Sequence, residues 1–268
     1  MVKESDGSLF KKVSYILIFL FCLIAVPVSA SNSLTSVELY TLGHKYEFNR
    51  DFDNALACYT KAIELDKNYI NAYAGRARVY SWLQRYDLSL GDNSKCIELD
   101  PSNFGFYLNR GHNYMGLEEY QMAIADYSKS IELADTFFAR KARGDAYIRN
   151  RQYELAMADF NRMARIWPRD SDVFLYRSQV YGLLGDYNNA LEECKQGTSI
   201  YPENSILLFN LGQCYEFLGN KDMAVEYYRK ALNKELTGRS HKKTAMVKNK
   251  INARIQGDWQ SYSEWIYY

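Results

Sequence analysis

The sequence predicts an all-α fold, an α-solenoid of stacked antiparallel helix pairs with a C-terminal capping helix. A tyrosine recurs with successive steps of 34, 34, 33, 34 and 34 residues, at Tyr46, Tyr80, Tyr114, Tyr147, Tyr181 and Tyr215. Around these tyrosines, apolar residues fall three and four apart, which is the spacing of one helix face. Fixed intervals of this size are typical of solenoids, in which each unit buries its apolar face only against its neighbours.

Each unit is expected to contain two helices. In the first unit these are Ser36–Phe48, where Leu39, Leu42 and Tyr46 share one face, and Phe52–Leu65. The short polar turn between them leaves room only for two antiparallel neighbours. Six such units occupy residues 36–236, starting near Ser36, Ile70, Phe104, Phe137, Ser171 and Ser205.

Small residues recur where the two helices of a unit are expected to cross. Helices that cross at about 8–10 Å need a small side chain at the point of closest approach. The first helices supply Gly43, Gly111, Gly144 and Gly212, and the second supply Ala55, Ala123, Ala156, Ala190 and Ala224. Proline is expected to stop the second helix, at Pro101, Pro168 and Pro202.

The repeated positions resemble those of the tetratricopeptide repeat family. Gly111 is followed by Tyr114, Tyr120, Ala123 and Tyr127, a spacing similar to the family pattern W-x₂-L-G-x₂-Y…A-x₃-F…P. The resemblance covers the six units, about three-quarters of the chain. It implies a superhelix whose concave wall binds an extended peptide or a partner helix. The second unit departs most from this pattern, at Ala77, Ser89 and Asn93, whereas the fifth departs at Ser178, Cys194 and Gly197 and the sixth at Lys221.

The remaining C-terminal residues, 237–268, are predicted to form a capping helix and an aromatic tail. The helix is expected over Ser240–Ile255, with lysines outward and with an inward face made of Ala245, Met246, Ile251 and Ile255. A terminal helix with a polar outer face closes the last interface of a solenoid.

The aromatic tail has three aromatic residues three positions apart, Trp259, Tyr262 and Trp265. This spacing favours a short helix that covers the end of the core. Two alternatives stay open: insertion of the tail into the protein's own groove, and capture of a partner.

Residues 1–30 read as a secretory signal peptide. Two lysines precede the apolar run Val13–Val28, and small residues lead to cleavage between Ala30 and Ser31. The apolar run is shorter than the roughly 20 residues that a membrane-spanning helix needs. The alternative is a membrane anchor that is not cleaved. The protein is therefore expected to be extracytoplasmic, periplasmic or secreted, or else membrane-anchored and facing outward.

The charge balance argues against nucleic acid as a partner. Without residues 1–30, the chain has 30 basic and 30 acidic side chains, and a neutral chain gives no electrostatic reason to bind nucleic acid or an anionic membrane. A membrane is expected only if the N-terminal segment is retained. One region is locally cationic: Lys234–Arg254 carries seven basic residues and one acid.

Catalytic and metal-binding patterns are not found in the sequence. Only three histidines occur, His44, His112 and His241, and none is spaced as a metal pair on one helix. There is no Gly-rich phosphate loop, nucleophile elbow or Cys-x-x-Cys motif. We therefore expect no enzymatic activity, no metal site and no cofactor.

Four cysteines follow residue 30: Cys58, Cys96, Cys194 and Cys214. Buried free thiols that fill small gaps in the core are the favoured interpretation. Export would permit disulfides. If a pair forms, Cys194–Cys214 is the one expected, because these residues lie on helices that face each other between the fifth and sixth units.

The concave wall is the predicted binding surface. In each unit, the residue two positions before the repeated tyrosine projects away from the packed side, and all six such residues are polar or charged. Neighbouring aromatics and amides complete the set. The predicted groove residues are His44, Arg78, Trp82, Asn109, His112, Asp145, Tyr176, Gln179, Asn210 and Gln213.

These features predict a non-enzymatic exported scaffold that binds an extended peptide or partner protein in its concave groove during envelope assembly or secretion. The alternative is a membrane-anchored structural component of an envelope complex, which acts through its convex or basic C-terminal surface. In both cases the partner is a protein or peptide.

Overall fold

The computed structural model describes residues 34–234 and 241–267, where thirteen helices and no strands are found. The first helices of the six pairs are α2 (Ser36–Phe48), α4 (Ile70–Trp82), α6 (Phe104–Gly116), α8 (Phe137–Arg149), α10 (Ser171–Leu183) and α12 (Ser205–Phe217). The second helices are α3 (Phe52–Leu65), α5 (Tyr86–Leu99), α7 (Tyr120–Leu133), α9 (Tyr153–Ile166), α11 (Tyr187–Ile200) and α13 (Lys221–Leu232). Helix α14 (His241–Ile255) follows. The predicted all-α solenoid is confirmed.

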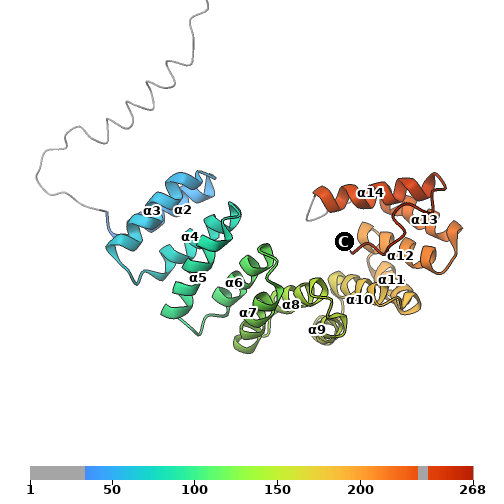
Figure 1. The fold of residues 1–268 in the computed structure, drawn as a ribbon, viewed down its shortest axis with the longest axis horizontal. Helices are drawn as coiled ribbons and strands as arrows, with labels where there is room; N and C mark the ends of the chain where they lie inside the picture. Colours follow the sequence, from blue (N-terminus) through green and yellow to red (C-terminus); the bar gives the residue numbers. More distant parts are fainter. Residues whose placement is uncertain (1–33, 235–240, 268) are drawn as a thin grey trace, which may run out of the picture.

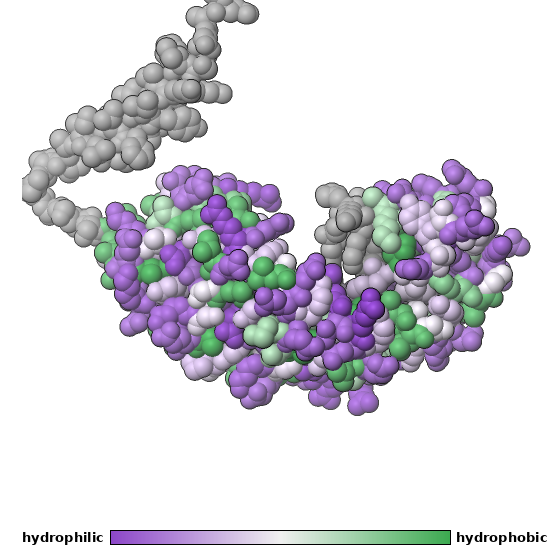
Figure 2. All heavy atoms as spheres, viewed as in Figure 1, coloured by the Kyte–Doolittle hydropathy of each residue, from purple (hydrophilic) through white to green (hydrophobic). Residues whose placement is uncertain are grey.

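The helix pairs follow one another along an arc, with α5, α7 and α9 at its outer edge and the C-terminus on its inner side (Figure 1). The space-filling view shows a hollow between the two ends of the arc (Figure 2). Residues 1–30, for which a signal peptide or anchor is predicted, lie outside the described residues. Among the helices that are described, none combines the length and the apolar character needed to cross a membrane.

Each repeated glycine makes room for an aromatic ring. A side chain at the glycine would collide with a ring on the second helix of the same unit, in the pairs Gly43–Tyr59, Gly111–Tyr127, Gly144–Phe160 and Gly212–Tyr228. All four rings are fully buried. The expected glycine at the helix crossing is thus present, but the group that needs the space is a ring rather than a backbone.

The second and fifth units depart from the pattern in a compensating way. Where glycine is replaced by Ala77 or Ser178, the ring on the second helix is replaced by the smaller Asn93 or Cys194. All four of these residues are buried. The two positions therefore change together because they share one volume in the core.

A ladder of ion pairs, absent from the sequence prediction, ties the two helices of each middle unit. Its four pairs are Arg76–Asp92, Arg110–Asp126, Arg143–Asp159 and Arg177–Glu193. Three of the arginines also donate to a hydroxyl of the preceding unit, on Thr60, Ser94 and Ser128. The ladder therefore fixes the packing within units and between them.

Removal of one arginine from this ladder should be costly. Arg110 donates to both carboxylate oxygens of Asp126, at 2.7 and 2.8 Å, and Asp126 is almost fully buried. Arg110→Ala would leave this carboxylate unpaired, so we expect a loss of about 2–3 kcal/mol in the free energy of unfolding. Lys129→Ala, which breaks the exposed Lys129–Glu132 pair, is the control and should change stability little. Equal effects in denaturant titrations would contradict the assignment.

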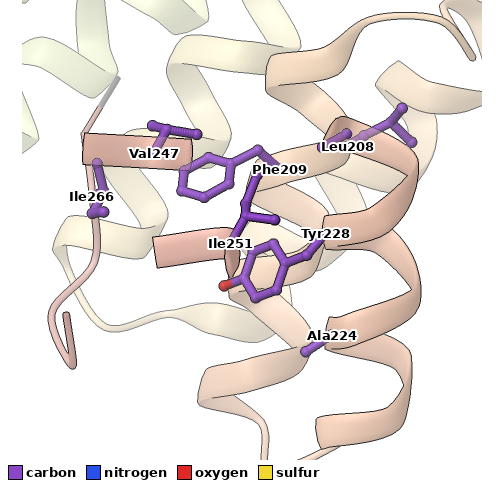
Figure 3. Packing of buried hydrophobic residues seen from close by; sticks show 8 residues of the cluster. Leu208, Phe209, Ala224, Tyr228, Val247, Ile251 and Ile266 are labelled. Carbon is purple, nitrogen blue, oxygen red and sulfur yellow. The ribbon is translucent and has the colours of Figure 1, made fainter. Parts of the chain in front are cut away.

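Helix α14 packs on the last unit through a face that matches the predicted one only in part, since Ile251 and Ile255 face inward as expected but Ala245 and Met246 are exposed. Its buried residues are Val247, Lys250, Ile251 and Arg254, whereas the predicted inward residue Met246 is 43% exposed. Figure 3 shows Val247 and Ile251 packed beside Phe209 and Tyr228, with Ile266 of the tail next to them. The face differs because acidic and carbonyl groups of the last unit and the tail pair with the two cations.

Candidate peptide-binding groove

The predicted groove residues separate into two groups along the concave wall. We define the open half as the exposed residues of α2, α4 and α6, namely His44, Arg78, Trp82, Asn109 and His112. The covered half consists of Asp145 on α8, Tyr176 and Gln179 on α10, and Asn210 and Gln213 on α12. All residues of the covered half except the half-buried Asp145 are buried. The whole wall was predicted to be free, so the burial of these four residues corrects that expectation.

Trp82 is the main apolar group of the open half. Its side chain is 55% exposed and leans against Phe52, with ring centroids 5.8 Å apart. It borders a pocket of about 320 Å³ that Tyr40, His44 and Phe48 also line. A large exposed ring beside an open pocket is typical of a surface that buries a partner side chain.

A second pocket, of about 260 Å³, opens on the other side of Trp82. Asn93, Asn109 and His112 line it, and it lies where the second unit has Asn93 in place of the usual ring. Asn93 donates to the backbone carbonyl of Ser89 at 3.0 Å. The departure of this unit from the repeat pattern therefore creates a polar recess in the open half.

Arg78 is not a free cation. Its guanidinium pairs with the buried carboxylate of Glu47, which also accepts a hydrogen bond from the Tyr59 hydroxyl. Burial opposes ionisation of Glu47, but the hydrogen bonds from Arg78 and Tyr59 outweigh it and lower the pKa of the carboxyl. Arg78 thus joins the first two units and offers the groove only the outer edge of its guanidinium.

His112 lies at the end of the open half. Its Nδ1 is 2.9 Å from the Tyr127 hydroxyl. Protein atoms that crowd the ring lower the pKa of His112, and the nearby Asp145 offsets part of this effect. The imidazole is therefore neutral at pH 7. Its other ring nitrogen remains available to a hydrogen-bonding group in the groove.

The covered half is occupied by the end of the chain. We call Glu264–Tyr267 the tail segment. The Ile266 amide N–H donates to Gln213 Oε1 at 2.8 Å, and Gln213 Nε2 donates to the Ile266 carbonyl at 3.1 Å. Lys250 Nζ donates to the Glu264 carbonyl at 2.9 Å. Side chains of α12 and α14 thereby bind three main-chain groups of the tail segment.

Side chains of the tail segment fill the wall around these contacts. The Trp265 ring packs against Gly182, where any side chain would collide with it. Tyr187 and Phe217, which stack on each other with centroids 4.6 Å apart, lie beside the Trp265 ring with centroids 6.0 and 5.9 Å from it. The Tyr267 hydroxyl donates to Asp145. Burial, followed by the charge of Asp145, raises the pKa of Tyr267 well above its usual value, so the hydroxyl stays protonated.

The tail therefore takes the alternative in which it enters the protein's own groove. The expected short helix through Trp259 and Trp265 is wrong, because residues 256–267 contain only turns and irregular backbone. The reason is Arg254, whose guanidinium donates to three carbonyls, those of Asp258, Ser261 and Tyr262. These contacts hold the chain in a compact turn. The tail also covers the end of the core, as expected, because Trp259 packs against the hydrophobic cluster formed by the last unit and α14.

Glu216 holds the two buried cations of α14. It pairs with Arg254 at 2.8 Å and with Lys250 at 3.6 Å, and it accepts a hydrogen bond from Tyr228. Burial nonetheless lowers the pKa of Lys250 to about 8, with Glu216 opposing the shift. The basic region of the C-terminal end thus loses two of its seven cations to the interior.

The described part of the chain contains neither a disulfide nor a group of residues that could hold a metal ion. Cys58, Cys96, Cys194 and Cys214 are free thiols, so the disulfide considered for Cys194–Cys214 is not formed. These two residues pack in one buried cluster with Ala190. Burial is the main cause that raises the pKa of Cys214. No group of three or more metal-ligating side chains occurs among the described residues.

Family comparisons agree with the repeat and its period. Models of the tetratricopeptide repeat match residues 36–69, 104–137, 175–204 and 206–233. The chain is a tetratricopeptide repeat protein. The glycine–ring pairs and the helix pairs described above belong to its repeat units. No curated protein sequence matches it.

Solved structures of other proteins share the fold. One from Parabacteroides merdae has a TM-score of 0.62 at 20% identity, over 84% of this chain and 86% of its own. PilW, described as a widely conserved type IV pilus biogenesis factor, has a TM-score of 0.63 at 20% identity, over 76% and 95%. YrrB, described as having an unusual peptide-binding site, has a TM-score of 0.53 at 22% identity, over 71% and 97%. At these identities the likeness concerns the fold alone.

Proposed function

We propose that this tetratricopeptide repeat protein is a non-enzymatic scaffold that holds an extended segment of a partner protein in the open half of its groove. The observation that carries the proposal is the exposed Trp82, set between two pockets on a concave wall. Around it lie neutral hydrogen-bonding groups, Asn109 and His112. A wall of this composition suits a peptide that offers one bulky apolar side chain and its own main-chain amides.

The covered half supports this mode of binding. Asn109 and His112 on α6 occupy the repeat positions that Asn210 and Gln213 occupy on α12, five and two residues before the repeated tyrosine. Gln213 binds both main-chain groups of Ile266. Asn109 and His112 of the open half thus present hydrogen-bonding side chains at positions equivalent to those that bind an extended backbone three hairpins further along.

Export completes the proposal. The basic start, apolar run and small residues of residues 1–30 support a cleaved leader, and hence a role in envelope assembly or secretion. The mature protein purified from its native source should begin at Ser31. An N-terminal sequence that retains the run Val13–Val28 would favour the membrane-anchored alternative.

Trp82→Ala is the direct test of the open half. We expect this variant to lose most capture of the natural partner from the native envelope fraction, because the ring that a partner side chain covers is gone. Helical content should be unchanged, since the side chain is largely exposed. Arg78→Ala is less informative, because it would leave the buried Glu47 unpaired.

Leu88→Ala is the matched control for this experiment. Leu88 is an equally exposed apolar residue of the same unit, but it lies on the second helix, α5. Capture by the control should equal that of the native chain. If Trp82→Ala also captures the partner as the native chain does, the open half is not the binding site.

A further inference from the structure

The tail segment binds the groove in the way that a separate peptide would. It has no helix, and its main chain is held by side chains of α12 and α14 rather than by its own hydrogen-bond ladder. Because the hydrogen bonds between Gln213 and Ile266 involve only the main chain of Ile266, this grip does not depend on the side chain at that position. Main-chain contacts supply affinity for any extended segment, and pockets for side chains supply the selectivity.

The side-chain pockets define what such a segment must carry. The slot over Gly182, beside the stacked rings of Tyr187 and Phe217, accepts a large flat ring. The next position is apolar and fully enclosed, as Ile266 is in the last core cluster. The third position needs a phenolic hydroxyl that donates to Asp145. These pockets select an aromatic, an aliphatic residue and a tyrosine in consecutive positions.

The tail segment does not fit its site without cost. The indole N–H of Trp265 is buried and makes no hydrogen bond within the described part of the chain. A buried donor without a partner costs about 1–3 kcal/mol. Lys250, which binds the Glu264 carbonyl, is also fully buried as a cation. A competing segment with a ring that lacks an N–H would avoid the first of these costs.

Release of the tail segment needs only a local movement. Arg254 holds the turn at Asp258, Ser261 and Tyr262, which therefore stays in place. Ser263 and Glu264, which follow the turn, are exposed. The last three residues of the tail segment can therefore leave the wall while α14 and its turn remain packed.

We propose that the covered half is a second peptide-binding site, for an extended partner segment with an aromatic–aliphatic–tyrosine sequence, and that the tail segment occupies it until such a partner displaces it. The inference rests on the proposed function and adds to it the chemistry of one partner class. A tethered occupant has an effective concentration on the order of millimolar. Only a partner segment that fits the same pockets and binds with high affinity would therefore displace the tail segment.

The experiment uses a fluorescein-labelled synthetic peptide with the sequence of Asp258–Tyr267 as its probe. Binding is measured by fluorescence anisotropy to the native chain and to a full-length double variant, Trp265→Ala with Tyr267→Ala, whose own tail is weakened. We expect the probe to bind the double variant at least about tenfold more tightly, because the tethered competitor is lost. A probe with alanine in place of its second tryptophan and last tyrosine should not bind.

Gly182→Val, added to the double variant, identifies the site. A side chain at this position fills the slot for the ring, so probe binding should be lost. Trp82→Ala in the same background should leave probe affinity unchanged. Absence of binding to the folded double variant, or binding that survives Gly182→Val, would overturn the inference. Loss of probe binding through Trp82→Ala would place the probe in the open half, which also overturns the inference but leaves the proposed function intact.

Two further outcomes are decisive. Sedimentation that shows dimers which disappear in the double variant would make a second copy the occupant, and this would overturn the assignment to a separate partner. If the double variant loses helical content, hydrogen exchange on the native chain replaces it. Excess probe should then accelerate exchange of the Ile266 amide, and unchanged exchange would refute displacement.

Discussion

Serine in place of Gly144 should destabilise the protein by about 1–3 kcal/mol, because the added side chain enters the volume of a buried ring. Even a Cβ at this position would collide with Phe160, which is fully buried and stacks on Tyr176 with centroids 5.0 Å apart. Phe160→Cys should cost about 3–5 kcal/mol, since it leaves a ring-sized cavity between two units. Denaturant unfolding followed by circular dichroism measures both values.

The double variant is the sharper part of this test. Gly144→Ser with Phe160→Cys reproduces the pair Ser178 and Cys194 that the fifth unit already has. We expect the double variant to be more stable than the sum of the single changes predicts, by at least about 1 kcal/mol, because the serine occupies part of the cavity. Additive effects would show that the two positions do not share one volume.

Arg254→Met should release the end of the chain and cost about 3–5 kcal/mol, because it removes a buried charge from Glu216 and a donor from three carbonyls. Methionine preserves most of the side-chain volume, so the guanidinium is the group under test. The Ile266 amide and its neighbours should exchange hydrogen faster, and fluorescence of Trp259 and Trp265 should shift toward that of exposed tryptophan. Arg254 is only 1% exposed in the native chain.

Arg229→Met is the control for this change. Arg229 is an exposed arginine in the last turn of α13, the helix that packs against α14. It should alter neither tail exchange nor stability appreciably. If Arg254→Met leaves exchange at the tail segment unchanged, the turn is held by packing of Trp259 rather than by the guanidinium.

The helices and their pairing could be predicted because the repeat supplies six copies of the same local pattern. The apolar face formed by Leu39, Leu42 and Tyr46 can be recognised locally, because its residues are only three and four positions apart. The pairing of a glycine with a buried ring was harder to predict, because the two partners, such as Gly144 and Phe160, lie on different helices. The joint departure of Ala77 and Asn93 from the repeat pattern was the available signal.

The capping helix and the tail could not be predicted in the same way. The lysines of α14, Lys250 among them, were expected to point outward, and no position was predicted for Arg254. Cations are rarely buried without partners, and the partner of both residues, Glu216, lies in another helix. Their spacing on one face with Val247 and Ile251 was the available signal. The contact between Gln213 and Ile266 spans 53 residues, so no local pattern contains it, and the free wall was predicted over its full length.

The hydroxyls that receive the ladder arginines have a consequence for how such arrays lengthen. The third unit presents an arginine to the unit before it, through Arg110 and Ser94, and a hydroxyl to the unit after it, through Ser128 and Arg143. A tandem duplication of this unit would recreate both joints with no new side chain. The middle of the protein can therefore lengthen by gene duplication. At the two ends, Glu47 pairs with Arg78 and Glu216 pairs with Arg254 and Lys250, so a duplicated end unit would not recreate its joints in the same way.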